Sequence, residues 1–444
     1  MSSRRVQWLA FAGAALMATA AARAQVGPQG GEYSIAGALP GDQVHPAASL
    51  QSGGGWLVWQ DNSITPIGSR ILATRLNPAL QQAQPGSNIV VSAAWKSKAT
   101  LDQENPDVAA LPDGSAIVVW QGGKVGAQRI YLRAISSTGK PLGGDFPVSA
   151  KSKFSQSNPK IATLPDGNVI VVWQSSDQDG SMLGVFARRF SPAGKAIGSE
   201  FQVNQFTQNN QRSPAVAARS SGFVVTWISE LQRTPAGVDV YARLFDTTGT
   251  ALTPEIVVNS TTNVICANPS VACNADGSFA VAWSQYNATV STAWTSGDSP
   301  DNYTLSRSDF HQSSVNGWDV HGRVFNASGA PLKDDPDFVL NRYLLGDQFG
   351  PRISAAGTNY FVVWTSLSQP VSSGSSTLDP WEGVFGQVLA ADGTPASDSD
   401  LHINTTIVSR QIQPAVASDG LRFLVVWTSF TAGTSFDLRA QVYR

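Results

Sequence analysis

Several chemically versatile residues are scarce in this 444-residue sequence, which has two cysteines, three methionines and four histidines. The cysteines and histidines show no metal-ligand spacing. There is also no Gly-x-Ser-x-Gly elbow, phosphate-binding glycine loop or cysteine-nucleophile signature. The enzyme classes that depend on these motifs therefore lack support, and no cofactor is expected. A glycosidase that uses two carboxylates needs no local motif, so this class stays open.

Charged side chains are also scarce, at 14% of the chain against a typical share of about 25%. The formal net charge is −2, and it becomes more negative if the three arginines of the first 24 residues are removed. Nucleic acids and anionic membranes recruit positively charged surfaces. Neither is expected as a partner.

Long apolar stretches are absent except at the beginning, where an apolar run extends from Trp8 to Ala22. This run is too short for a stable membrane span. Two arginines precede it and a small-x-small cleavage sequence follows it, which is typical of a secretory signal peptide. We therefore expect residues 1–24 to be removed and residues 25–444 to form a single domain. The protein is expected to be secreted or periplasmic, without membrane insertion.

A repeated pattern fills the rest of the chain. A proline followed by an apolar strand, a turn and a tryptophan recurs seven times, and the two residues are 13 or 14 positions apart in every copy. The pairs are Pro46/Trp59, Pro106/Trp120, Pro159/Trp173, Pro214/Trp227, Pro269/Trp283, Pro351/Trp364 and Pro414/Trp427. A fixed internal period of this length indicates a repeat architecture.

The best-preserved copy, residues 158–204, divides into four short apolar runs separated by turn residues, the pattern of a four-stranded antiparallel sheet. Its second run is apolar without interruption from Val169 to Trp173, which indicates burial of both faces. The residue three positions after each proline is always Ala or Ser, as expected where the first strands crowd around a common axis. These features predict an all-β fold, a seven-bladed β-propeller of four-stranded blades.

The two ends of the mature chain complement each other. The seventh copy ends at Arg444 after its third strand, and its missing fourth strand has a counterpart in residues 32–36, whose sequence EYSIA aligns with EFQVN at 200–204. We expect the N-terminal strand to complete the last blade and close the ring, which removes two free sheet edges. An open array of small sandwiches is the alternative, but it does not explain the divided seventh unit.

The repeat pattern also resembles a known class of sequences. The succession PxVAxLxDGxxVVWQS, GVFARRF and GxEFxVN, best preserved in the copies that begin at Asn105 and Asn158, is similar to the tandem repeats of secreted bacterial adhesin-like and calcium-repeat-containing proteins. The resemblance covers nearly the whole mature chain. It implies an exported protein of surface or envelope context and brings no catalytic residues with it.

Sequence variation is concentrated in the loops between the second and third strands. Residues 285–317 form an insert in blade five, and residues 366–380 form one in blade six. Long loops on a rigid scaffold commonly carry function, although such an insert also occurs as a plain surface loop. The candidate ligand-binding residues are Trp294, Tyr303, Asp309, His311 and Trp381.

Three functions are compatible with this pattern. The leading expectation is a monomeric, non-catalytic protein that binds an extracellular glycan or a surface protein through the loop-rich face, so that an enzyme is the less expected outcome. The alternative is a secreted carbohydrate-active hydrolase or lyase, with carboxylates such as Asp298, Asp301 and Asp309 at the axial mouth. The second alternative is a structural component of the envelope.

Two polar positions recur at fixed places in the repeat and are interpreted first as architecture. A glutamine three residues before the proline occurs as Gln43, Gln103, Gln156, Gln211, Gln348 and Gln411. An arginine in the third strand occurs as Arg133, Arg188, Arg243 and Arg323, with Gln387 and Gln441 in its place in later copies. We expect hydrogen bonds to loop backbone or to neighbouring blades. A ring of amides lining the axial mouth is the alternative for the glutamines.

The fifth copy has Cys266 where the others have this glutamine, and the second cysteine of the chain is Cys273. In an oxidising compartment two cysteines seven residues apart, one in a loop and one on the following strand, can form a disulfide. We expect this bridge to be slightly favoured over two separate buried thiols.

Overall fold

The computed structural model describes residues 26–63, 68–84, 86–92, 102–151, 153–286, 317–333, 336–372, 375–433 and 435–444. This part of the chain consists of β-strands and turns and contains no helix. It therefore offers no helix long and apolar enough to cross a membrane. The all-β prediction is confirmed.

The strands follow one another in groups of four along the chain. The first four groups are β2 (Gln43–Gln51), β3 (Gly54–Asp61), β4 (Arg70–Leu76), β5 (Ile89–Val90); β6 (Gln103–Ala110), β7 (Ala116–Gly122), β8 (Arg129–Ile135), β9 (Pro141–Pro147); β10 (Gln156–Thr163), β11 (Val169–Ser176), β12 (Leu183–Phe190), β13 (Ala196–Gln202); and β14 (Gln211–Arg219), β15 (Gly222–Glu230), β16 (Val238–Asp246), β17 (Ile256–Val257). The others are β18 (Ile265–Cys273), β19 (Phe279–Tyr286), β20 (Trp318–Phe325), β21 (Phe338–Val339); β22 (Gln348–Ala356), β23 (Asn359–Leu367), β24 (Glu382–Leu389), β25 (Leu401–His402); and β26 (Gln411–Ser418), β27 (Phe423–Thr431), β28 (Ser435–Tyr443) with β1 (Tyr33–Ser34).

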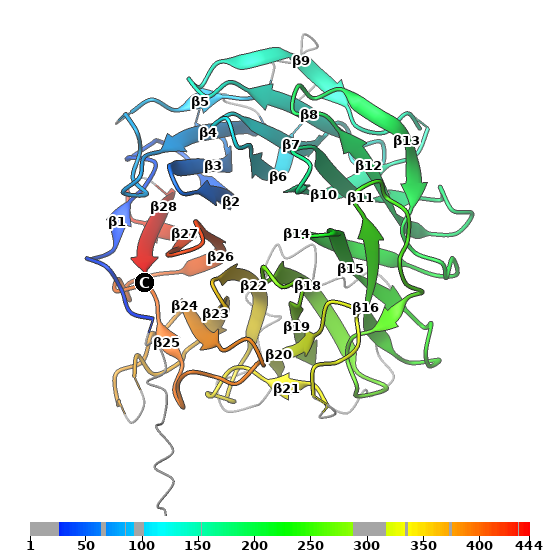
Figure 1. Cartoon of the computed structure of the whole chain (residues 1–444). Coiled ribbons are helices and arrows are strands. Elements are labelled where there is room, and N and C mark those ends of the chain that lie inside the picture. Colours follow the sequence, from blue (N-terminus) through cyan, green and yellow to red (C-terminus); the bar gives the residue numbers. More distant parts are fainter. Residues whose placement is uncertain are drawn as a thin grey trace, which may run out of the picture.

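These strands form six sheets in the described part of the chain, five with four strands and one with eight. The eight-stranded sheet contains two antiparallel groups, β14 to β17 and β18 to β21, which are joined by a single parallel pair between Val238 and Ile265. Figure 1 shows the groups following one another around a common centre, with β2, β6, β10, β14, β18, β22 and β26 innermost. The innermost strands thus come from every part of the chain.

The N-terminal strand belongs to the last sheet, as predicted. Tyr33 pairs with Ala440 and Ser34 with Arg439, so β1 extends the order β28, β27, β26, and it lies beside β28 near the C-terminus (Figure 1). The backbone N–H of Gly27 also donates to the carbonyl of Arg444 at 2.9 Å.

The core lies between neighbouring sheets because the second strand of each group has two buried faces. Each tryptophan of the repeat is fully buried: Trp59, Trp120, Trp173, Trp227, Trp283, Trp364 and Trp427. One cluster, for example, combines Ile117 and Val119 of β7 with Val169 and Val171 of β11. Removing roughly 200 Å² of each indole from water contributes about 5 kcal/mol of transfer free energy. The unbroken apolar runs are therefore explained by burial between two sheets.

An acidic residue in the fourth strand or directly before it connects neighbouring groups. The Glu200 carboxylate accepts a hydrogen bond from the backbone N–H of Ala150, in the preceding group, at 3.0 Å. The same contact to the preceding group is made by Glu255, Asp337, Asp400 and Glu32. Glu32 precedes β1, so the N-terminal segment makes the contact that its alignment with the repeat implies.

The recurring arginine and glutamine positions are architectural, as predicted. The arginine donates to a backbone carbonyl of the preceding group, for example from Arg188 to Val148 at 3.0 Å, and the same bond occurs at Arg133, Arg243 and Arg323. The glutamines are fully buried, and several donate to their own loop, as Gln156 does to the carbonyl of Lys151. The alternative, a ring of amides open to the axial mouth, is wrong.

The predicted disulfide is also wrong. Cys266 and Cys273 are free thiols, and both lie in β18. Seven residues of extended strand span roughly 23 Å, whereas a disulfide requires Cα atoms about 4 to 7 Å apart. The prediction failed because the strand already begins at Ile265, so Cys266 is not in a loop.

Candidate functional site

The loop-rich face that the sequence singles out lies largely outside the described residues. Trp294, Tyr303, Asp309 and His311, together with Asp298 and Asp301, belong to the segment 287–316, which the structure does not describe. Trp381 is described by the structure and lies directly before β24. Its exposed fraction is 41%. Its backbone carbonyl accepts a hydrogen bond from Ser368 at 3.0 Å. Of the five predicted ligand-binding residues, Trp381 is thus the one that lies in the described part of the chain.

A second candidate site lies on the innermost strands. Each of these strands has a bulge at its proline, and the residue before the proline has positive φ: His45, Asn105, Asn158, Ser213, Asn268, Gly350 and Gln413. Asparagine and glycine tolerate this backbone conformation best. His45, with φ of 52°, is the only ionisable residue at this position of the repeat.

The residue after the proline departs from the repeat more clearly. In chain order this position is Ala47, Asp107, Lys160, Ala215, Ser270, Arg352 and Ala415. Four of the innermost strands have a small side chain at this position, whereas β6, β10 and β22 have an ionisable side chain there. Positions that recur in every copy serve the architecture, whereas an ionisable group in only three copies is not required by it. We call His45, Asp107, Lys160 and Arg352 the axial cluster.

Backbone and side-chain contacts hold the axial cluster in place. The two Asp107 oxygens accept from the backbone N–H groups of Val108 and Ile161, each at 3.0 Å. Asp107 therefore joins β6 to β10 directly beside Lys160. The backbone N–H of His45 donates to Oε1 of Gln413 at 3.0 Å, and its Nε2 lies 3.4 Å from the Gln413 amide nitrogen. These contacts connect the first, second, third and last groups.

The cations of the cluster are arranged differently. Arg352 donates from Nη1 to the carbonyl of Pro351 at 3.0 Å. Lys160 has no hydrogen-bond acceptor for its ammonium group among the described residues. All four side chains of the cluster are partly buried and keep some exposed surface.

Burial and mutual repulsion change the protonation of these groups. Burial lowers the pKa of His45 to about 4, and the charges of Lys160 and Arg352 act in the same direction. Burial also lowers the pKa of Lys160, with Asp107 opposing and Arg352 adding to this shift. Burial raises the pKa of Asp107, against the neighbouring cations and the two backbone hydrogen bonds. At neutral pH His45 is therefore a neutral imidazole near the side chains of Lys160 and Arg352.

This combination of groups can perform acid–base chemistry on an anion. A guanidinium holds a carboxylate at a fixed place. A neutral imidazole can accept a proton, and a lysine with a lowered pKa can release one. A perturbed titratable cluster on an otherwise regular scaffold is a candidate active site.

Sequence reasoning missed this cluster, although one signal was present. The position after each proline reads A, D, K, A, S, R, A through the repeats, and comparing the copies column by column isolates three ionisable residues. The small residue two positions later draws attention instead, since it recurs in every copy.

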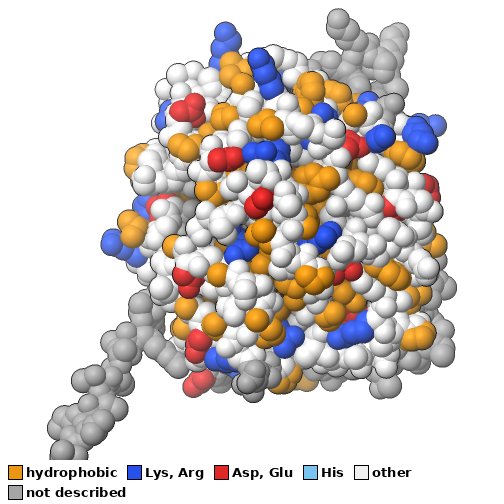
Figure 2. Space-filling view, turned by 45° about the vertical axis from the view of Figure 1, so that its right-hand side comes forward, with side chains coloured by type: hydrophobic (Ala, Val, Ile, Leu, Met, Phe, Trp, Pro, Cys, Tyr) orange, Lys and Arg blue, Asp and Glu red, His pale blue; other side chains and the backbone are white. Residues whose placement is uncertain are grey.

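The surface of the described part of the chain carries mixed charge. Figure 2 shows Lys and Arg side chains interspersed with Asp and Glu on the visible face, without a large area of one sign. In the described part of the chain no cluster of at least three His, Cys, Asp or Glu side chains could hold a metal ion.

The sequence matches no protein-family model and no curated protein, so the resemblance to adhesin-like repeats remains a prediction. Solved structures share the fold. An ulvan lyase of polysaccharide lyase family PL25, solved with a bound saccharide of glucuronate and sulfated rhamnose, is 10% identical with a TM-score of 0.52, covering 92% of this chain and 95% of that one. A protein of unknown function from Dyadobacter fermentans is 10% identical with a TM-score of 0.50, covering 80% of this chain and 97% of that one. An α-L-arabinofuranosidase of family GH93 from Fusarium graminearum is 9% identical with a TM-score of 0.46, covering 94% and 98% of the two chains.

At these identities the comparisons establish the fold, an all-β arrangement of the propeller type. They also correct the leading functional prediction, because the neighbours that share this fold include a polysaccharide lyase with a TM-score of 0.52. The prediction of non-catalytic binding, in which an enzyme was the less expected outcome, is therefore wrong.

Proposed function

We propose that this chain is a carbohydrate-active enzyme, a lyase that cleaves an anionic polysaccharide by β-elimination at the axial cluster. The observation that carries the proposal is the cluster itself, three ionisable residues at a position where the other copies have small side chains, beside a neutral histidine. The shared fold supports the proposal, since the ulvan lyase was solved with a uronate-containing saccharide bound.

Each residue has a distinct role in this proposal. Arg352 pairs with the carboxylate of a uronate sugar, which stabilises the negative charge that develops beside it. His45 takes the proton from the carbon next to this carboxylate. The electron pair left behind forms a carbon–carbon double bond, and the glycosidic carbon–oxygen bond at the β position breaks. Lys160 gives a proton to the departing sugar oxygen, and Asp107 positions Lys160.

The proposal includes the architecture that brings these residues together. We propose a closed ring of seven four-stranded blades, in which the eight-stranded sheet counts as two blades linked by one residue pair and β1 completes the seventh. Contacts between β2 and β26, the first and last innermost strands, support closure. We also propose export, with residues 1–24 as a signal peptide, which N-terminal sequencing of the exported protein would test.

The reaction type is tested by incubating purified residues 25–444 with polyuronates, sulfated glycans and neutral glycans. β-Elimination produces an unsaturated uronate that absorbs ultraviolet light together with a new reducing end, whereas hydrolysis produces the reducing end alone. Ultraviolet-absorbing product from a polyuronate, lost in Arg352→Gln, is the expected result. Reducing ends without absorbance, or no product from any substrate, would contradict the proposed lyase.

A further inference from the structure

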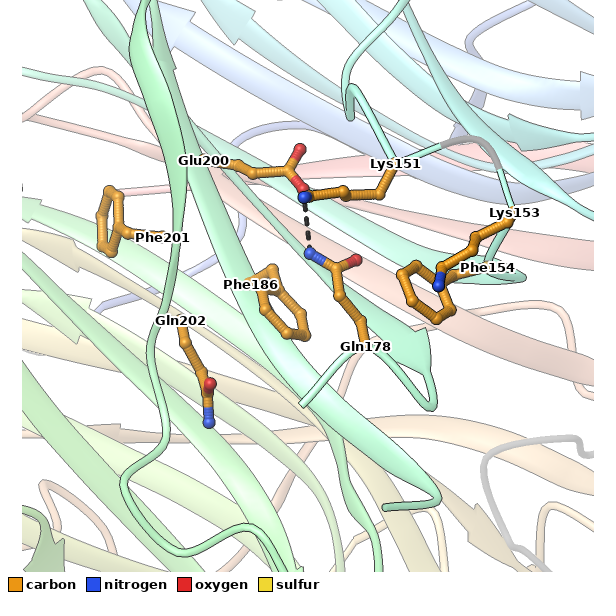
Figure 3. Close-up of a pocket in the computed structure, with 8 residues that line it drawn as sticks. All are labelled: Lys151, Lys153, Phe154, Gln178, Phe186, Glu200, Phe201 and Gln202. Atoms are coloured by element: carbon orange, nitrogen blue, oxygen red, sulfur yellow. Dashed lines mark hydrogen bonds between the residues drawn. The ribbon is translucent and has the colours of Figure 1, made fainter. Parts of the chain in front are cut away.

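A hollow of about 350 Å³ lies on the loop-rich side of the third group of strands, away from the axial cluster. Figure 3 shows the side chains that surround it. They come from the loop before β10, the loop between β11 and β12, and the outer strands β12 and β13. They are Lys151, Lys153, Phe154, Gln178, Phe186, Glu200, Phe201 and Gln202.

Hydrogen bonds fix the loop that supplies the lysines. The backbone N–H of Lys151 donates to the Ser149 hydroxyl at 3.0 Å, and its carbonyl accepts from the buried Gln156 amide at 3.0 Å. Lys153 lies over the ring of Phe154, with its ammonium 4.6 Å from the ring centroid. Both lysines are exposed and Phe154 is partly exposed. In Figure 3 the Lys153 ammonium lies at the Phe154 ring, whereas the Lys151 side chain extends from the same loop towards Glu200.

The carboxylate in the hollow is already occupied by protein donors. Glu200 accepts from the Gln178 amide at 2.8 Å and from the backbone N–H of Ala150 at 3.0 Å. Gln178 in turn accepts from the Ser175 hydroxyl at 2.8 Å. Glu200 makes the contact between groups that recurs in the repeat. The two lysines carry two positive charges and Glu200 carries one negative charge, so the hollow has a net charge of +1.

Lysines occupy this loop in two copies of the repeat, as Lys151 and Lys153 here and as Lys96 and Lys98 in the sequence of the loop before β6, which lies outside the described residues. The corresponding described loops, residues 205–210, 260–264, 342–347 and 405–410, contain no lysine. As in the axial cluster, the charges occur where the architecture does not require them. A phenyl ring beside two ammonium groups matches a sugar that presents an apolar ring face and a carboxylate or sulfate.

We propose that this hollow is an accessory binding site for an anionic sugar of a glycan chain, held by Lys151 and Lys153 and stacked on Phe154. Three strand spacings separate β10 from β13, so the hollow lies roughly 15 Å from the innermost strands. A glycan that occupies both places extends over the third group by several sugars. This connection to the axial cluster rests on the proposed function, whereas binding in the hollow does not.

The test measures affinity of the full mature chain for dextran sulfate, polygalacturonate and unmodified dextran of similar length by calorimetry. Lys151→Gln combined with Lys153→Gln is compared with Lys140→Gln combined with Lys195→Gln, a pair of exposed lysines in the turns at the opposite end of the second and third groups. Both double variants remove the same charge. We expect the first to weaken binding of an anionic chain about tenfold, the second to have less than a twofold effect, and dextran to bind in neither case.

A fall in dextran sulfate binding alone would assign the site to sulfate, and a fall in polygalacturonate binding alone would assign it to a uronate. Equal weakening by both double variants would overturn the proposal, because binding would then follow overall charge. Phe154→Leu should weaken binding further without changing its salt dependence. Arg352→Gln separates the two proposals: it should abolish turnover and keep lysine-dependent binding. Lysine-dependent binding in a protein without turnover would leave the hollow established and the proposed lyase refuted.

Discussion

Acidification should destabilise this protein through His45, and His45→Asn should remove that effect. The folded pKa of His45 is about 4, against about 6.5 in an unfolded chain. Between these two values the unfolded state binds more protons, so the free energy of unfolding rises with pH in this window. The stabilisation is fully present above pH 6.5 and is lost progressively as the pH falls towards 4.

The size of the effect follows from the two pKa values. Each pH unit by which the folded pKa differs from the unfolded pKa corresponds to about 1.4 kcal/mol in the free energy of unfolding. Lowering the pH from 7 to 5 therefore removes about 2 kcal/mol of this free energy. Asp107 contributes with the opposite sign, since burial raises its pKa. Because Asp107 is present in both proteins, the difference between wild type and His45→Asn isolates the histidine.

Asparagine is the appropriate replacement because it occupies the same position at Asn105, Asn158 and Asn268 with φ near 50°. The fold therefore accommodates it without backbone strain. Urea unfolding of both proteins at pH 7 and pH 5 gives the four free energies required. A loss in wild type about 2 kcal/mol larger than in the variant is expected. Equal losses in the two proteins would show that His45 is not held neutral beside Lys160 and Arg352.

Three further outcomes are expected. Arg352→Gln should reduce kcat on a polyuronate by at least about a hundredfold with an unchanged Tm, whereas an equal loss with Arg75→Gln, on β4, would point to general charge. Deleting residues 26–36 removes β1 and the buried side chains of Val26 and Ile35, which should lower the free energy of unfolding by about 5 kcal/mol; an unchanged urea midpoint would contradict ring closure. Unfolded, unreduced protein should incorporate two equivalents of an alkylating reagent, since both cysteines are free, and zero incorporation would restore the disulfide.

The fold was predictable because the residues that the architecture requires recur in the copies of the repeat. The buried tryptophan, the proline bulge and the acidic contact between groups each recur around the ring, so one copy explains the others. Glu32 illustrates this well: its alignment with Glu200 predicted a strand in the last sheet, and its carboxylate accepts from Thr405 and Thr406. The cysteine prediction failed for the opposite reason, since Cys266 is an isolated exception whose strand boundary the pattern did not give.

The candidate site was not predictable in the same way, because its members share no local motif. His45 and Arg352 are separated by 307 positions and meet only because the first and sixth innermost strands face a common centre. Spacing rules for catalytic motifs depend on neighbouring residues in one element, and they cannot detect a set that takes one residue from each strand. In a repeat protein the informative comparison is between copies. A residue type that recurs in the copies indicates a structural role. A charged residue that occurs in few copies indicates a role that the fold does not require. By that criterion Asp107, Lys160 and Arg352, each directly after a proline, are the positions at which these copies differ from the shared scaffold.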